Sequence, residues 1–184
     1  MSRLKKTYKE QIAKKFLEEG YTNTLAVPKV TKVIVHSGIG KERANQKFVE
    51  MVKHNLTAIT GQKPALRKAR QAIAGFKVRE GDAVGLMVTL RGEKMYDFLE
   101  KLANVTLPRL RDFRGLDVKG FGQSGNFNLG IKEHVIFPEI SHEQDAIHGL
   151  EIAIVTTAKN KEDGQKLLAM LGFPFKSASP ADKE

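Results

Sequence analysis

The sequence contains no cysteine among its 184 residues. Without thiols it can form no disulfide bond, no cysteine-based zinc site and no thiol nucleophile. The five histidines form neither an HExxH motif nor an i, i+4 pair, so no metal site is predicted. Nucleophile elbows of the G-x-S-x-G type are also missing. We therefore expect no catalysis, no metal and no cofactor.

Long apolar segments are missing too, since no run approaches the roughly 20 residues that a membrane-spanning helix needs. The first residues, MSRLKKTYKEQ, lack the apolar segment of a secretory signal. We expect a soluble protein without a membrane partner, and the absence of cysteine fits a reducing cytoplasm. The hydrophobic fraction of 41% is enough for a core. The length favours a single domain over residues 1–176, followed by a disordered tail at 177–184.

Acidic residues are scarce relative to basic ones. The chain has 31 lysines and arginines against 21 aspartates and glutamates, a formal charge of +10. The excess lies in residues 1–130, which carry +13, whereas residues 131–184 carry −3. Lysine and arginine release counterions from phosphates on binding, so this distribution favours a polyanion partner. A soluble basic protein without such a partner is the alternative.

Hydrophobic periodicity predicts helices that alternate with strands. Apolar stripes at helical spacing predict helices over residues 3–19, 42–60, from about 95 to Pro108, and one ending at Gly172. Period-two alternation or β-branched runs predict strands within 27–40, 65–70, 84–91, 127–131 and 150–157. Glycines at 75, 81 and 85 are interpreted as turn positions.

Several of these strands have one apolar and one polar face. Such strands form a sheet that helices cover on one side only, so the predicted class is α+β, with a mixed, mostly antiparallel sheet. The opposite face would be open and would carry hydroxyl, amide and basic groups: Lys32, His36, Thr89, Arg91, Asn126 and Asn128. Short polar side chains that reach 2′-hydroxyls and base edges suit shaped RNA, so this open face is a candidate RNA surface.

The stretch from Gln62 to Arg79 has six basic side chains and no acidic one. Unpaired cations at this density are too costly to bury, so the segment is expected to project as a basic arm at about residues 70–82. Ile73 and Phe76 have too little apolar company to form a core there. We expect these two side chains to lie against a partner whose phosphates meet Lys77 and Arg79.

Two glycine motifs resemble nucleotide-binding sequences. GFGQSG, residues 120–125, matches G-x-G-x-x-G, but a loop precedes it and an apparent strand follows, whereas a dinucleotide site needs a preceding strand and a following helix. SGIGKER, residues 37–43, has a glutamate where a phosphate loop needs a hydroxyl. We therefore interpret both as loops and expect no small-molecule substrate.

Six longer motifs point to one family. IAGFKVREG, VTLRGEKMYDFLEKL, LPRLRDFRGL, GNFNLGIKEHVIFPEI, IAIVTTA and LLAMLGFPF occur in that order, and the resemblance they carry covers residues 27–175. They closely resemble the bacterial large-subunit ribosomal protein family that binds 5S rRNA, universal family number five. The resemblance implies a cytoplasmic, non-enzymatic ribosomal protein that anchors 5S rRNA in the central protuberance, within the large-subunit rRNA.

The resemblance also implies particular 5S rRNA-binding residues. The family's positions fall on Gln62, after the second helix, and on Thr89, on the open strand face. A third position, usually asparagine in the family, is His36 here, and an imidazole places its donor and acceptor differently from an amide. Lys32, Lys63 and Arg91 complete the predicted 5S rRNA-binding set.

The family's loop that contacts P-site tRNA matches residues 72–81. The predicted contact residues in it are Ile73, Ala74, Gly75, Phe76, Lys77 and Arg79. A bridge to a ribosomal protein of the small-subunit head is implied as well. Apart from the resemblance, a nucleotide-binding enzyme and a protein-interaction scaffold remain alternatives. Saturable nucleotide binding would mark the enzyme, and partner binding with little salt dependence would mark the scaffold.

Overall fold

A computed structural model describes residues 2–40, 42–111, 113–140 and 146–176 of the chain. Helices and strands alternate, and the strands form a five-stranded sheet, so the predicted α+β class is confirmed. The chain divides into two compact units, one of residues 1–32, 91–128 and 154–184 and the other of residues 33–90 and 129–153. The single domain expected over residues 1–176 stays a prediction. The tail expected at 177–184 lies outside the described residues.

The sheet has the strand order β2-β3-β1-β5-β4. Its strands are β1 (Val30–Gly38), β2 (Ala65–Lys68), β3 (Ala83–Leu90), β4 (Phe127–Ile131) and β5 (Leu150–Thr156). β3 pairs antiparallel with β1 and with β2. All five predicted strands are present. β2 ends before the predicted Arg70, next to a shift in pairing register between Arg67 and Lys68.

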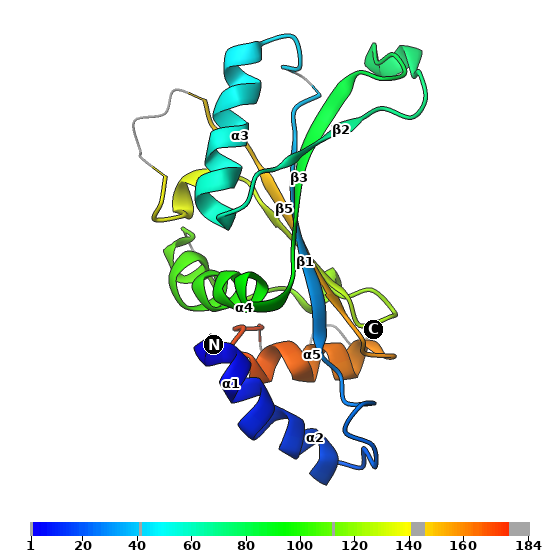
Figure 1. Ribbon diagram of the computed structural model, residues 1–184, viewed down its shortest axis with the longest axis vertical. Coiled ribbons are helices and arrows are strands. Elements are labelled where there is room, and N and C mark those ends of the chain that lie inside the picture. The colour runs from blue at the N-terminus through cyan, green and yellow to red at the C-terminus, as the bar shows by residue number, and fades with distance from the viewer. Residues whose placement is uncertain (1, 41, 112, 141–145, 177–184) are drawn as a thin grey trace. The chain divides into compact units, whose positions relative to one another are not determined.

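In the unit of residues 33–90 and 129–153, β1 and β3 bury alternate side chains. Val35 of β1 and its pairing partner Val88 of β3 are both buried. Helix α3 (Gln46–Thr60) contacts β3 and presents the fully buried Leu56. His36 and Thr89, which alternate with the buried positions, are only half-buried. In this unit the sheet therefore has one face that helix α3 covers and one that stays accessible (Figure 1).

Helix α3 begins at Gln46, four residues later than predicted. The residues from Glu42 form a turn instead, in which the Asn45 amide donates to the Glu42 carbonyl. The Asn45 side-chain oxygen accepts from the Phe48 amide at 3.3 Å and so caps the first turn of the helix. The predicted end is confirmed, because Gly61 adopts φ 64° as a left-handed C-cap.

The unit of residues 1–32, 91–128 and 154–184 contains the other helices. They are α1 (Arg3–Thr7), α2 (Ala13–Glu18), α4 (Gly92–Lys101) and α5 (Lys161–Met170). A π-helical turn over Tyr8–Ile12 joins α1 to α2, so the helix predicted over 3–19 is one continuous helical segment. π-helical residues 102–106 and a 3-10 turn over 107–109 follow α4. Pro108 therefore lies in the last helical turn, and the helical segment ends one residue after it, close to the predicted end.

Two glycines in this unit bring the turn before β4 against α5. The turn is closed by the bridge between Phe121 and Phe127 and by the Gly122 amide, which donates to the Asn126 carbonyl at 2.9 Å. A Cβ atom on Gly164 of α5 would lie 2.4 Å from the carbonyl oxygen of Gly125. GFGQSG is thus a hairpin turn that leads into a strand, as the loop interpretation expected, and the residues that follow it do not form the helix that a dinucleotide site needs.

The close contact between Gly164 and Gly125 predicts that a side chain at position 164 destabilises the fold. Gly164→Ala should lower the free energy of unfolding by about 1–3 kcal/mol, because the new methyl group meets backbone that cannot move aside. This loss runs against helix propensity, which favours alanine by roughly 1 kcal/mol. Urea denaturation measures the difference. Gly130→Ala is the control, since a Cβ there meets nothing within 4 Å; equal effects of the two variants would contradict the packing argument.

Candidate RNA-binding surface

The end of α3 is tied to β3 at two of the predicted RNA-binding residues. The side-chain amide of Gln62 donates to the backbone carbonyl of Thr89 at 3.3 Å. The Gln62 backbone is itself held by Thr60, whose hydroxyl oxygen accepts from the Gln62 amide at 3.3 Å while its proton goes to the Leu56 carbonyl at 2.6 Å. The bond to β3 uses the carbonyl of Thr89 and not its hydroxyl, so the hydroxyl on the accessible face is not consumed by it. The sheet and helix thus bring these two residues together.

His36 shares the accessible face with Thr89. β1 and β3 pair His36 with Met87 and Ile34 with Thr89, so His36 and Thr89 are diagonal neighbours on adjacent strands. Diagonal pairs of this kind lie about 7–8 Å apart. Gln62, Thr89 and His36 therefore lie near one another within this unit, although 53 positions separate His36 from Thr89 in the chain. We call these three residues the polar edge; the apolar Ile34 and Met87 pair with Thr89 and His36 on the same face.

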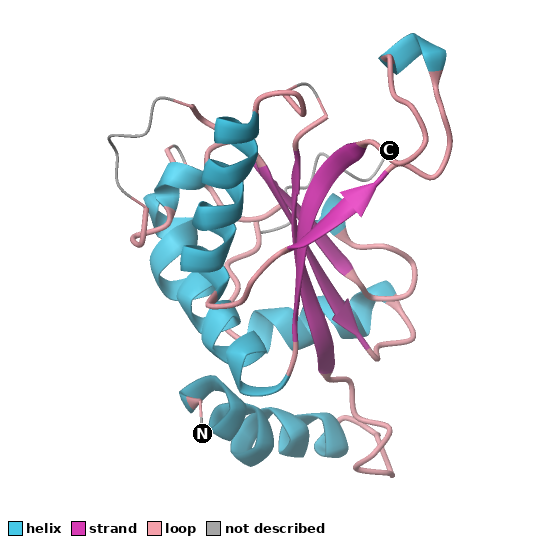
Figure 2. Cartoon of the chain, turned by 45° about the horizontal axis from the view of Figure 1, so that its top comes forward, coloured by secondary structure: helices cyan, strands magenta, loops and turns pink. Residues whose placement is uncertain are grey.

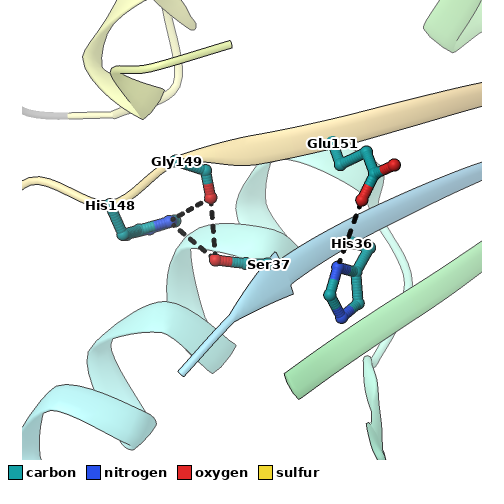
Figure 3. Close-up of polar contacts among 5 residues, drawn as sticks. All are labelled: His36, Ser37, His148, Gly149 and Glu151. Carbon is teal, nitrogen blue, oxygen red and sulfur yellow. Dashed lines mark hydrogen bonds and ion pairs between the residues drawn. The ribbon is translucent and has the colours of Figure 1, made fainter. Parts of the chain in front are cut away.

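The His36 ring lies over Gly85 of β3. A Cβ at Gly85 would come within 2.4 Å of His36 Nε2, so the imidazole fills the space of the missing side chain. Its Nδ1 lies 3.8 Å from a carboxylate oxygen of Glu151 on β5 (Figure 3). The interpretation of Gly85 as a turn position is wrong. It lies inside β3, where glycine makes room for the neighbouring ring.

The sequence prediction did not include Arg67 in the 5S rRNA-binding set, although the pairing places it on the same face. β2 pairs Arg67 with Gly85 and Ala65 with Met87, so Arg67 faces the same side as His36. Its side chain is exposed. The alternation along β2 could have indicated this, but only the register with β3 shows which neighbours it meets.

The remaining predicted cations are accessible in different degrees. Lys63 is exposed and directly follows Gln62. Lys32 is half-buried and Arg91 is exposed, and both belong to the unit of residues 1–32, 91–128 and 154–184. Asn128 is exposed on β4, whereas the Asn126 side chain accepts from the Thr156 amide at 2.9 Å and supports the turn. Asn126 is therefore a structural residue in the strand pairing.

Between β2 and β3 the chain forms a small tip, residues 72–81. Figures 1 and 2 show a short helical turn at the end of this β2–β3 hairpin. The turn is 3-10 helical over Ala74–Phe76, and Ile73 bridges to Val78 across it. Lys77 follows in the left-handed conformation with φ 52°. The side chains of Ile73 and Phe76 are 49% and 75% exposed, so the tip has no core of its own.

The six cations of the stretch from Gln62 to Arg79 are all exposed. The group comprises Lys63, Arg67, Lys68, Arg70, Lys77 and Arg79. In the other unit Arg109, Arg111 and Arg114 are exposed as well. Exposed cations leave their fields available to phosphates, and from Gln62 to Arg79 no acidic residue offsets them.

A buried polar network lies beneath β1 and α3. The rings of His134 and His148 stack with centroids 3.9 Å apart, and both are buried. Asn55 Nδ2 donates to His148 Nε2 at 3.2 Å, which leaves the proton on Nδ1, 3.1 Å from Ser37 Oγ. The Ser37 hydroxyl donates in turn to the Gly149 carbonyl at 2.9 Å (Figure 3). Sequence reasoning found these histidines only as residues without a metal-binding pattern.

This network requires a neutral His148. A proton on His148 Nε2 would face the Asn55 amino group, donor against donor. The Nδ1 of His134 accepts from the His148 amide at 3.3 Å, so a hydrogen bond joins the two histidines in addition to the ring stacking. Burial and, secondly, the charge of a protonated His134 lower the pKa of His148 to about 4. The cluster is therefore structural.

The described part of the chain supports neither a metal site nor a membrane-spanning helix. No group of three histidine, aspartate or glutamate side chains there could hold a metal ion. No helix among the described residues is long and apolar enough to cross a membrane.

Comparison with known proteins identifies the class of protein to which this chain belongs. The Ribosomal protein L5 family model matches residues 23–79, and a second model, of the C-terminus of the same ribosomal family, matches residues 83–175. The large ribosomal subunit protein uL5 of Desulfatibacillum aliphaticivorans is 51% identical over 178 residues, covering 96% of this chain and 99% of that protein. Its counterpart in Microcystis aeruginosa is 52% identical over 176 residues, or 95% and 98% of the two chains. In Halothermothrix orenii the identity is 49% over 177 residues, or 95% and 99%.

These matches define an RNA-associated structural protein and not an enzyme. The chain belongs to the ribosomal protein L5 family. The predicted family and the predicted lack of enzymatic activity are confirmed, and the nucleotide-binding enzyme is excluded as an alternative. The large-subunit proteins of this family are cytoplasmic in bacteria.

The buried network predicts a pH dependence of stability. The pKa of His148 is about 4 in the folded protein against a usual 6.5, so the unfolded chain takes up the proton first as the pH falls. The contribution of this group to stability is fully present above pH 6.5 and is lost between there and pH 4, by about 3 kcal/mol. Urea denaturation at several pH values measures the slope. His148→Gln should flatten it, whereas His54→Gln, at an exposed position of α3, should leave it unchanged; the same slope in both variants would contradict the assignment.

Proposed function

We propose that this chain is a constituent of the large ribosomal subunit that binds 5S rRNA and attaches it in the central protuberance. It contacts P-site tRNA through residues 72–81 and forms a bridge to a ribosomal protein of the small-subunit head. The polar edge of Gln62, Thr89 and His36 supports the first part, since it lies on an accessible sheet face beside exposed cations. Contacts with the large-subunit rRNA complete the assembly.

Two kinds of side chain contribute to RNA binding on this surface. Lysines and arginines supply a long-range, sequence-independent attraction and set the orientation on the phosphates. Here these are Lys32, Lys63 and Arg91. The hydroxyl, amide and imidazole groups are short, so they reach 2′-hydroxyls and base edges only where the RNA surface fits the sheet. The protein therefore recognises the RNA by the fit of the two surfaces, without any covalent step.

The distinguishing experiment compares 5S rRNA with an unrelated folded RNA of similar length in a gel-shift titration. Preference for 5S rRNA supports the proposal, and equal affinity contradicts it. With about 6–10 phosphate contacts the 5S affinity should fall roughly 10³-fold or more between about 50 and 200 mM salt. A flat response to salt would instead favour the protein-interaction scaffold.

Side-chain truncation on the polar edge should weaken 5S binding. Thr89→Ala and Gln62→Ala should each cost on the order of 1 kcal/mol or more in affinity, because a well-placed polar contact to the RNA is lost. Thermal melting shows whether folding is retained. Gln46→Ala, at the exposed opposite end of α3, is the matched control and should bind normally. Normal binding by both edge variants would remove these residues from the site.

His36 allows a finer test of the same surface. His36→Asn restores the family's usual residue and should preserve or tighten 5S binding, as measured in the same gel-shift titration. A large loss would mean that the imidazole makes its own contact, in the position that Gly85 and Glu151 give it.

The arm should act on tRNA and not on 5S rRNA. Replacing residues 73–80 with a short glycine–serine linker should leave folding and 5S affinity nearly unchanged, because the tip has no core of its own. Ribosomes with this variant should release P-site tRNA faster in a dissociation assay. Ile73→Ser with Phe76→Ser, and Lys77→Ala with Arg79→Ala, separate the apolar from the electrostatic contribution. Loss of 5S binding with unchanged tRNA release would show that the arm has a different partner.

A further inference from the structure

One side chain outside the arm contacts it at two places. Arg43 lies in the turn between β1 and α3. Its guanidinium donates from Nη2 to the carbonyl of Lys77 at the tip, and its Nε lies 3.4 Å from a carboxylate oxygen of Asp82 at the base. Its Nη1 donates to the Gly40 carbonyl at 3.1 Å, which fixes the guanidinium to its own turn. All four residues belong to the same compact unit.

The arm has little else to order it. At its base Ala69 pairs with Asp82 and Gly81, through the Ala69 amide to the Asp82 carbonyl at 2.8 Å and the Gly81 amide to the Ala69 carbonyl at 3.0 Å. The tip itself has only the hydrogen bonds of one turn, including the Ile73 amide to the Val78 carbonyl at 2.9 Å. An open pocket of about 980 Å³ lies beside the tip, lined by Phe76 and Lys77 of the tip together with Arg43 and Ile147. Because Phe76 is 75% exposed, apolar packing does little to fix the tip there.

Asp82 connects the same contact to the backbone of the arm. The carboxylate oxygen that faces Arg43 also accepts from the Arg79 amide at 2.9 Å. The Lys77 carbonyl that accepts from Arg43 belongs to a non-glycine residue with positive φ, a strained conformation that needs outside support. Arg43 thus contacts both the strained residue, Lys77, and the carboxylate of Asp82 that accepts from the Arg79 amide.

We propose that Arg43 is a positioning residue that orders the arm for its RNA partner. A guanidinium suits this role because its donors form a rigid planar fork, so it holds three acceptors in fixed directions, whereas lysine is a flexible point charge. Ordering the tip in advance removes part of the entropy that binding would otherwise have to overcome. The consequence for tRNA rests on the proposed function, but the ordering itself does not.

Amide hydrogen exchange followed by NMR on the full chain tests the ordering. In Arg43→Ala the amides of Ile73 and Val78 should exchange about tenfold to a hundredfold faster, because charge-assisted hydrogen bonds are lost. Arg43→Lys, which keeps the charge without the fork, should give intermediate rates. Lys47→Ala removes an equal charge from an exposed site in the first turn of α3 and should leave the arm unchanged. The amides of Val52 and Leu56 in α3 report on general loosening and should not change.

Two readouts separate this inference from the proposed function. Faster exchange in the arm supports the positioning role, and trypsin cleavage after Lys77 and Arg79 should accelerate in parallel. If ribosomes with Arg43→Ala also release P-site tRNA faster at unchanged 5S affinity, the tRNA contact is supported too. Faster exchange with unchanged tRNA release supports the positioning role and contradicts the tRNA contact. Exchange at the wild-type rate in both Arg43 variants overturns the inference, whatever the tRNA does.

Discussion

The antiparallel pairing of β1 with β3 is the constraint on which the rest depends. Strand side chains alternate with a period of two, so once Val35 and Val88 are buried beneath α3, His36 and Thr89 must face the other way. A slip of one residue would bury the polar edge and expose the core. The same pairing that holds the fold together therefore also assembles the candidate RNA surface, and the two cannot be changed independently.

Missing side chains are used in two different ways in this protein. At Gly85 the missing side chain lets the His36 ring lie against the neighbouring strand, which holds this large polar ring in place. At Gly164 the empty position lets a helix touch the backbone of Gly125. The first shapes an accessible surface and the second closes a core. The strand sequence VGLMVTL and the helix sequence EDGQKLL look equally ordinary around their glycines, and only the three-dimensional neighbours distinguish them.

Local signals predict the features that local physics decides. Gly61 ends α3 where the apolar stripe stops, and the faces of β1 and β3 follow their alternation. The start of α3 escapes prediction because charged residues from Glu42 are good helix formers, yet the Asn45 side chain caps the helix better. Gly85 escapes it for a different reason: it follows closely on the turn residues around Gly81, and the ring that occupies its empty position comes from another strand. The stacked pair of His134 and His148 and the three contacts of Arg43 are set by tertiary structure alone.

The arm and the sheet face differ in rigidity and in reach, and an RNA-binding protein can use both. The sheet face is rigid because the core fixes both strands, so its short side chains have defined positions but little reach. The tip between β2 and β3 has reach but no core, and Ile73 and Phe76 stay exposed. A polar contact from a residue outside the arm can order such a tip without covering the apolar surface that a partner would use. Arg43 supplies that contact through the backbone carbonyl of Lys77, which leaves the Lys77 ammonium group outside the contact and available to phosphates.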